Sequence, residues 1–162
     1  MAPLTLRDAG LYESLLGIVY FTLMMAMATG SYLARRVSSE INGIRTFLLS
    51  GAAITLTIAL LLRLCHSKLT AVFILGSLLI FEILIGAYYV FIAHIRNSVI
   101  PPSEIRASAI SMISLINSGV GMITLPLFLA LGDIALKWAI CSILLVIGMV
   151  VFEIWKTRYA QS

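Results

Sequence analysis

The stretch LTAVFILGSLLIFEILIGAYYVFIAHI, residues 69–95, decides what kind of fold this chain can adopt. It contains one carboxylate residue, Glu82, and neither lysine nor arginine. About 20 consecutive, mostly apolar residues are enough for an α-helix to cross the hydrocarbon core of a bilayer. The stretch is longer than that, so we predict a transmembrane helix with a carboxyl group near its middle.

The rest of the chain shares this apolar character. Of its 162 residues, 61% are hydrophobic and 11% are charged, and its mean hydropathy is +1.09. A water-soluble domain of this size cannot cover its surface with so few charges. We therefore predict an all-α, polytopic membrane helix bundle, a single transmembrane domain over residues 1–162 with five transmembrane helices. The expected spans are about 11–33, 44–64, 69–95, 105–131 and 134–154.

The net charge of +4 fits loops at a membrane surface and gives no reason to expect nucleic acid, because Lys and Arg gather in cytoplasmic loops. Seven basic residues on one side against four on the other predict a cytoplasmic C-terminus and an outward N-terminus. An outward N-terminus with no signal peptide is natural for a fragment whose preceding helices are missing. The C-terminal side has Arg35, Arg36, Arg45, Arg96, Arg106, Lys156 and Arg158, and the other side has Arg7, Arg63, Lys68 and Lys137.

Glu82 is the strongest single candidate for a functional residue. A charge at the bilayer centre costs about 2.5–3.5 kcal/mol or more, so such residues usually face a bundle interior or a water-filled path. Helical spacing puts Gly86 and Tyr89 on the same stripe, with space beside the carboxyl group and a hydroxyl two turns away. We expect a proton or substrate site, or a partner for a cation on another helix. The alternative is a neutral carboxyl that hydrogen-bonds a neighbouring helix for packing alone.

The span 105–131 carries a stripe of small polar residues. Ser114, Ser118 and Gly121 recur along one face, beginning at Ser111, and Asn117 lies beside them. Residues of this kind let helices approach closely and hydrogen-bond to one another, which is their commoner use. The hydroxyls and the amide are also candidate donors to an anion in a substrate pathway.

The same span contains the elements of a bend. Pro126 cannot donate the helical hydrogen bond to the carbonyl of Met122, and Gly119 and Gly121 lie one to two turns before it. We expect the helix to bend here, in a manner suited to gating.

The loop between the third and fourth spans is the most polar stretch of the chain. Pro101 and Pro102 end one helix, and Ser103 is placed to cap the next. Arg96 and Arg106 flank the loop at the membrane surface. They either contact lipid phosphates or pair with acids at neighbouring helix ends and so latch one conformational state.

The sequence contains no motif typical of an enzyme active site. Cys65 and Cys141, with His66 and His94, lack the spacing of a metal or redox motif. Neither a Gly-rich phosphate loop nor a paired-carboxylate or nucleophile–base arrangement occurs. We expect a protein that is not an enzyme, with no cofactor and no metal site.

One group of residues carries a family resemblance. These residues are Phe81-Glu82, Gly86-Ala87-Tyr88, Arg96, Ile100-Pro101 and Glu104-Ile105-Arg106-Ala107. The pattern resembles the molybdate-anion transporter family, a branch of the major facilitator superfamily. The resemblance implies that the five spans match helices eight to twelve of a partial major-facilitator fold. It also implies a cytoplasmic C-terminus and a cell membrane in preference to an internal one.

Other positions match that family less closely. The segment 30–36 is similar to the superfamily's cytoplasmic Gly…Asp-Arg loop motif, with Ala34 where the acid is expected. Val90 and Phe91 follow the helix-ten tyrosines where the family tends to have a proline. The basic residue that the family places in helix eleven has no counterpart near Ser114.

Two functions are compatible with these observations. The first is the C-terminal part of a secondary transporter for a small solute such as the molybdate anion, working by alternating access with a missing N-terminal half or another helical chain. The second is a small membrane protein that does not transport: a truncated paralogue, an assembly subunit or a gene fragment. The lipid bilayer is a partner in both.

Overall fold

The computed structural model describes residues 16–36, 40–64, 68–99 and 105–159, and within these ranges the chain is helical except for short turns. Five helices in the described part are long and apolar enough to cross a membrane, which confirms the predicted helix bundle. Residues 11–15 of the first expected span lie outside the described part. The helices are α2 (Leu16–Ala34), α3 (Glu40–Leu64), α4 (Lys68–Val99), α5 (Ile105–Ala130) and α6 (Ile134–Tyr159).

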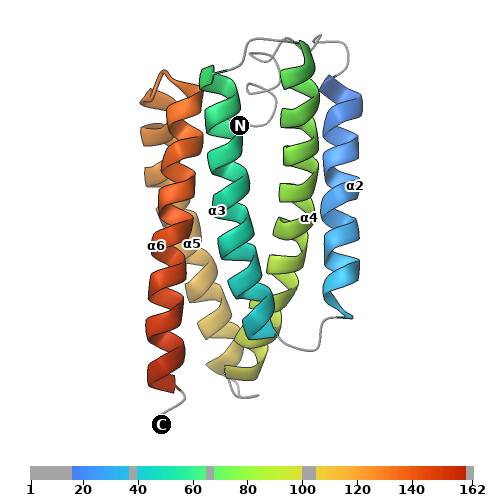
Figure 1. Cartoon of the computed structure of the whole chain (residues 1–162). Helices are drawn as coiled ribbons and strands as arrows, with labels where there is room; N and C mark the ends of the chain where they lie inside the picture. Colours follow the sequence, from blue (N-terminus) through green and yellow to red (C-terminus); the bar gives the residue numbers. More distant parts are fainter. Residues whose placement is uncertain (1–15, 37–39, 65–67, 100–104, 160–162) are drawn as a thin grey trace.

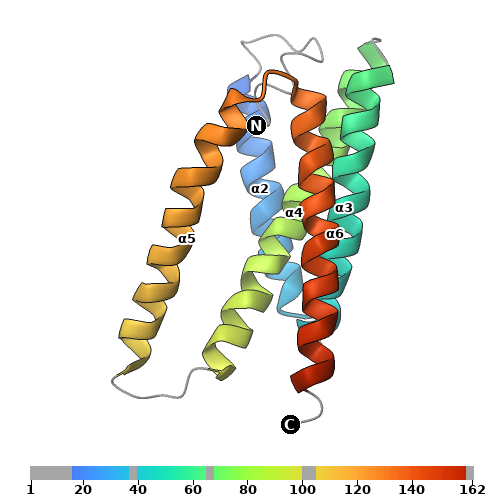
Figure 2. The ribbon, with the colours of Figure 1, turned by 90° about the vertical axis from the view of Figure 1, so that its left-hand side faces the viewer.

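Four of these helices form a row, and the fifth stands apart from it. The row runs α2, α4, α3, α6, because α2 packs on α4, α4 packs on α3, and α3 packs on α6 (Figure 1). The helix α5 has no comparable packing partner among the described elements, and Figure 2 shows it separated from the row along most of its length. The helices α2, α4, α3 and α6 therefore form one closely packed layer, and α5 packs on this layer much less extensively.

The contact between α2 and α4 is made by glycines. A Cβ atom on Gly30 would run into the backbone carbonyl of Ile83, and one on Gly86 would run into the carbonyl of Met27. The hydroxyl of Ser31 donates to the carbonyls of Met27 (3.1 Å) and Gly86 (3.0 Å). Helices in lipid associate through such close packing, because lipid chains are as apolar as the side chains they would replace.

This crossing changes the interpretation of two segments. We expected Gly86 to leave space beside the carboxyl of Glu82, and this is wrong, because the backbone of α2 takes up the space at Gly86. Gly30 and Ser31, which belong to the segment similar to a loop motif, lie inside α2 and pack on α4. A side chain larger than hydrogen fits at neither glycine.

The pair α3 and α6 is joined near its middle and at both ends. Near the middle, the buried hydroxyl of Ser142 donates to the carbonyl of Ala52 over 2.9 Å. At one end, Arg63 pairs with Asp133 over 2.7 Å. At the other end, Arg45 Nε lies 3.4 Å from a carboxylate oxygen of Glu153. These three contacts hold the antiparallel helices in one register.

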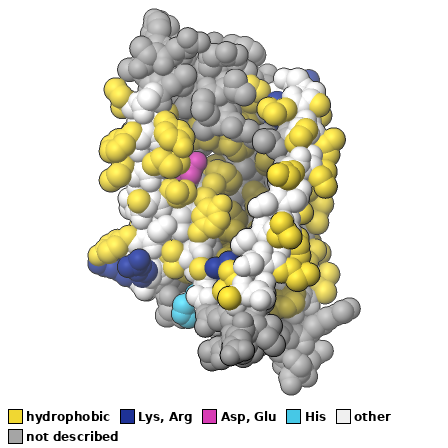
Figure 3. Space-filling view, turned by 180° about the vertical axis from the view of Figure 1, so that it is seen from behind, with side chains coloured by type: hydrophobic (Ala, Val, Ile, Leu, Met, Phe, Trp, Pro, Cys, Tyr) yellow, Lys and Arg dark blue, Asp and Glu magenta, His cyan; other side chains and the backbone are white. Residues whose placement is uncertain are grey.

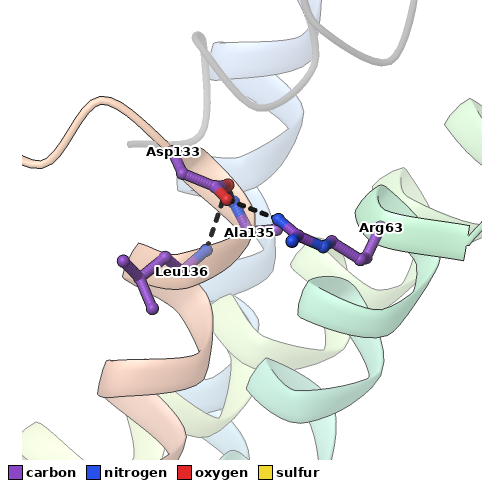
Figure 4. Close-up of polar contacts among 4 residues, drawn as sticks. All are labelled: Arg63, Asp133, Ala135 and Leu136. Carbon is purple, nitrogen blue, oxygen red and sulfur yellow. Dashed lines mark hydrogen bonds and ion pairs between the residues drawn. The ribbon is translucent and has the colours of Figure 1, made fainter.

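Asp133 has a second role at the start of α6. Its Oδ1 accepts hydrogen bonds from the backbone amides of Ala135 (2.8 Å) and Leu136 (3.2 Å), while its Oδ2 accepts from Arg63 (Figure 4). The first amides of a helix have no partner within the helix, and a side-chain oxygen at the N-cap satisfies them. One carboxylate therefore caps α6 and links it to α3.

Aromatic and aliphatic side chains fill the row between α3, α4 and α6. Phe47 stacks on Tyr88 with ring centroids 4.3 Å apart, and Phe81 meets Trp138 edge to face at 6.1 Å. The side chain of Phe91 covers Gly43. The helix α4 is thus held on one flank by backbone contact with α2 and on the other by aromatic packing on α3.

We predict that Gly86→Ala destabilises the protein by about 1–3 kcal/mol, the usual effect of overpacking a close contact. The added methyl group would meet backbone atoms of α2, which cannot rotate away. Reversible unfolding in mixed micelles measures the change. The matched control is Gly76→Ala on the same helix, where a Cβ atom meets nothing within 4 Å. Equal stability of the two variants would refute the role given to this crossing.

At Asp133, substitution by Ala and by Asn separates the cap from the ion pair. Asn caps a helix about as well as Asp, so Asp133→Asn removes only the exposed ion pair, worth at most about 1 kcal/mol. Asp133→Ala also removes the cap and is expected to cost a further ~0.5–2 kcal/mol. Arg63→Gln should match Asp133→Asn in the same unfolding measurement. If the Ala and Asn variants are equally stable, the cap does not stabilise α6.

Candidate functional site

Glu82 lies in the middle of the longest described helix, α4, and is half-buried. Its neighbours on the helix point in known directions: Gly86 faces α2, and Phe81 and Tyr88 face α3 and α6. Helical spacing places Glu82 and Tyr89 together on the flank between these two directions. Tyr89 is 62% exposed there. Glu82 therefore lies on an open face of the row and not within the packed layer.

The carboxyl of Glu82 forms neither an ion pair nor a hydrogen bond with the part of the chain that the structure describes. A carboxyl group without a partner in the hydrocarbon region is costly unless it faces water, another polar group or a proton. The alternative expected from the sequence, a carboxyl bonded to a neighbouring helix for packing, has no partner within the described helices.

Figure 3 shows the face of the molecule on which α5 lies. The surface is recessed between α5 and the row, and hydrophobic side chains cover most of it. An acidic side chain lies among them, well away from the Lys and Arg side chains nearer one end.

The helix α5 presents its serines on an exposed face. Ser111, Ser114 and Ser118 are exposed, and their hydroxyls make no hydrogen bond within the described residues. By contrast, Thr124 of the same helix donates to the carbonyl of Val120 over 2.8 Å. The side chains of Asn117 and Gly121 lie outside the described residues.

Large apolar side chains lie both beside these serines and on the other sides of α5. No described side chain of α5 is buried. The large exposed ones are Met112, Ile113, Leu115, Ile116, Val120, Met122, Ile123, Leu127 and Leu129. A bilayer covers such side chains without cost, but it offers the serine hydroxyls no hydrogen-bond partner.

Gly119, Gly121 and Pro126, where a bend is expected, all lie within the single helix α5. The helix α5 runs through Pro126 from Ile105 to Ala130, and a Cβ atom on Gly119 would meet nothing within 4 Å. The bend itself stays a prediction. Within the described residues, no hydrogen bond or ion pair joins Glu82 or Tyr89 of α4 to the serines of α5.

The basic residues separate to the two ends of the helices as the sequence analysis expected. At one end, where α2, α4 and α6 end and α3 begins, lie Arg35, Arg36, Arg45, Arg96 and Lys156 (Figure 1). At the opposite end lie Arg63 and Lys137. The guanidinium of Arg36 is held by Tyr32, whose hydroxyl accepts a hydrogen bond of 2.9 Å and whose ring lies 5.3 Å away.

Of the two expected latch residues, only one has a described side chain. Arg96 is half-buried, and its buried Nε has no hydrogen-bond partner within the described chain. The side chain of Arg106, and the loop 100–104 between them, lie outside the described residues. The latch function of the two arginines therefore stays a prediction.

Lys137 is a buried charged residue that the sequence pattern alone does not identify as a candidate. In the sequence, Lys137 is one of the four basic residues assigned to the outward side. In the structure it is buried, with 7% of its surface exposed. The signal was its position, one turn inside a predicted span and directly before Trp138, in place of an apolar residue. Among the described residues, no group of three or more His, Cys, Asp or Glu side chains could hold a metal ion.

The fold and these residues define a class: a multi-pass α-helical membrane protein with polar groups inside its spans that have no partner in the described chain. Comparison with models of protein families, with curated proteins and with solved structures finds no match to this chain.

Proposed function

We propose that this chain is the C-terminal part of a secondary transporter for a small solute, working by alternating access. The observation that carries the proposal is Glu82, a carboxyl group in the middle of a membrane-spanning helix, half-buried and without a partner in the described chain. Ionisable residues at such depth usually mark a substrate or proton pathway, because burial in lipid for packing alone is costly.

None of the described side chains of α5 is buried, which supports a functional protein that contains more helices than those described. Transporters of this type bind their substrate near the bilayer midplane, between two sets of helices that rock about the site. The row α2, α4, α3, α6 would form one wall, and α5 would present Ser114 and Ser118 to the pathway. A missing N-terminal half or another helical chain would supply the opposite wall.

The resemblance indicates an oxyanion such as molybdate as the solute. An anion and an ionised Glu82 would repel each other across a medium of low dielectric constant. The consistent mechanism is symport, in which Glu82 takes up a proton when the anion binds and releases it on the other side. Arg96 and Arg106 would latch one state at the basic end of the helices, and that end would face the cytoplasm of the cell.

The described helices also suit a second candidate, a membrane protein that does not transport. The four helices of the row are joined by close contacts, whereas α5 packs on no described helix to a comparable extent. An assembly subunit or a truncated paralogue would use α5 to bind a partner helix. It would not need a substrate path, and Glu82 would pair with a cation of that partner.

Orientation can be measured with an impermeant thiol reagent. In a background with Cys65→Ser and Cys141→Ser, we expect Gly132→Cys to react in intact cells and Arg35→Cys to react only after permeabilisation. Gly132 lies in the turn before α6, and Arg35 lies in the turn after α2 at the opposite end. The reverse pattern would place the C-terminus outside and contradict the proposed orientation.

Transport is tested by molybdate uptake in cells that express the full natural reading frame. Wild-type uptake should rise as the outer pH falls, because protonation of Glu82 accompanies anion binding. Glu82→Gln, which is neutral at every pH, should lose this pH dependence and at least about ten-fold of the accumulation, since one lost interaction of 1.4 kcal/mol is a factor of ten.

The control for this variant is Glu153→Gln, an acid on α6 that pairs with Arg45 at the basic end. It should keep the wild-type pH profile. Unchanged transport by Glu82→Gln across the pH range would refute proton coupling at this residue. Absence of any uptake by the wild type, for molybdate and other oxyanions, would favour the non-transporting candidate.

A further inference from the structure

Three polar residues lie in a line along one flank of α4. Glu82, Tyr89 and Arg96 recur every seven residues, and seven residues fall only ~20° short of two full turns of an α-helix. On the same helix Tyr88 faces α3 and Gly86 faces α2. The line therefore runs along the flank between those two directions, in the half of α4 nearer the basic end of the helices.

This line leads from the middle of the membrane to its surface. Two heptads separate Glu82 from Arg96, which is ~21 Å at a rise of about 1.5 Å per residue. Half the thickness of the hydrocarbon core is about 15 Å, so Arg96, in the last turn of α4, lies beyond its edge. At this separation the two side chains cannot pair with each other.

Beyond Glu82, toward the opposite end of the helices, the same flank is closed. Leu78 lies one turn before Glu82 and is 1% exposed. It belongs to a packed core cluster that includes Leu23 of α2 and Trp138 of α6. Toward the basic end the flank is open instead, since Tyr89 is 62% exposed. Glu82 thus lies where the closed part of the flank meets the open part.

Arg96, at the open end of the line, has unsatisfied hydrogen-bonding groups. Its buried Nε has no hydrogen-bond partner, and its guanidinium forms no ion pair with a carboxylate of the described residues. Other arginines at the same end are engaged, since Arg36 donates to the hydroxyl of Tyr32 and Arg45 pairs with Glu153. A buried donor of this kind is unfavourable unless water or a ligand supplies an acceptor.

Water along this flank would satisfy the groups at both ends of the line. Lipid chains offer neither an acceptor to Arg96 nor a donor to the carboxyl of Glu82, which has no partner in the described chain. Figure 3 shows that this face is recessed, with an acidic side chain in the recess and Lys or Arg side chains nearer the basic end. Polar groups that line a recess open at one end suit the passage of a hydrated ion.

We propose that Glu82, Tyr89 and Arg96 line a water-filled path for a small anion, which opens at the basic end of the helices and ends at Glu82. Arg96 attracts the anion at the opening, because a cation beside a passage with apolar walls concentrates anions there. Tyr89 donates a hydrogen bond to the anion one heptad further in. Arg96 acts on the anion in this open state, whereas the latch would engage it in the closed one.

The proposal rests on the proposed function and deepens it, because it names the residues of the path and the side from which Glu82 is reached. It is tested by the reaction of single cysteines with charged methanethiosulfonate reagents, which modify a thiol in water but not one in lipid. In the full natural reading frame with its native cysteines replaced by serine, Tyr89→Cys should react at least ten-fold faster when the reagent is applied at the basic end than at the other side.

The matched control is Leu49→Cys on α3. Leu49 is 52% exposed, and it lies at the depth of Tyr89 because its neighbour Phe47 stacks on Tyr88. It is two residues from Phe47 and so lies on the side of α3 turned away from α4. Leu49→Cys should react from neither side of the membrane.

The charge at the opening is tested with a negatively and a positively charged reagent at Tyr89→Cys. Arg96→Gln should lower the ratio of the anionic to the cationic rate about four-fold or more, since the loss of one charge ~10 Å away acts in opposite directions on the two reagents. Arg96→Lys should keep the ratio. The control is Arg36→Gln at the same end, on α2, which should leave the ratio unchanged.

Reaction of Tyr89→Cys no faster than that of Leu49→Cys would overturn the proposal, because the flank then faces lipid. Reaction mainly from the side opposite the basic end, or a ratio of rates that Arg96→Gln leaves unchanged, would overturn it as well. None of these reactions requires transport. The uptake and pH profile of Glu82→Gln therefore judge the proposed function independently.

Discussion

Backbone contact between α2 and α4 is the interaction on which the rest of the described structure depends. In lipid, apolar side chains gain little by leaving their surroundings for one another, so helices associate where their surfaces fit closely. Gly30 and Gly86 each receive the backbone of the opposite helix, and Ser31 bonds across the crossing to the carbonyl of Gly86. This contact fixes the rotation of α4 about its own axis. It thereby decides which flank meets the aromatic side chains of α3 and which flank, that of Glu82, is left open.

The second helix pair is held differently. The helices α3 and α6 are joined by a buried hydroxyl bond near the middle and by ion pairs at both ends. Both ion pairs are partly exposed, so each contributes little free energy and mainly sets register. Tyr88 of α4 stacks on Phe47 of α3, and Phe81 of α4 meets Trp138 of α6 edge to face, so the two pairs are linked by aromatic side chains.

The polar groups without partners are unevenly distributed over this framework. Hydroxyls on α2, α3 and α4 bond to carbonyls one turn back, as Thr22, Thr57 and Ser77 do. The hydroxyls of Ser114 and Ser118, the carboxyl of Glu82 and the ammonium group of Lys137 have no such bond within the described residues. Ser114 and Ser118 are exposed and Glu82 is half-buried on a flank that the packing of the row leaves free, whereas Lys137 is buried.

The sequence by itself determined the number, length and character of the helices, because the bilayer requires about 20 apolar residues per span and backbone bonds satisfied within each helix. It also identified Glu82 from the cost of a charge in an apolar run, and it placed the basic residues at the correct ends. Only the tertiary structure decided that Gly86 receives α2 and leaves no space beside Glu82, that α5 stands apart, and that Lys137 is buried. These facts depend on which helices are neighbours and how each is rotated. Hydropathy cannot reveal that, since a lipid-facing side and a helix-facing side are equally apolar.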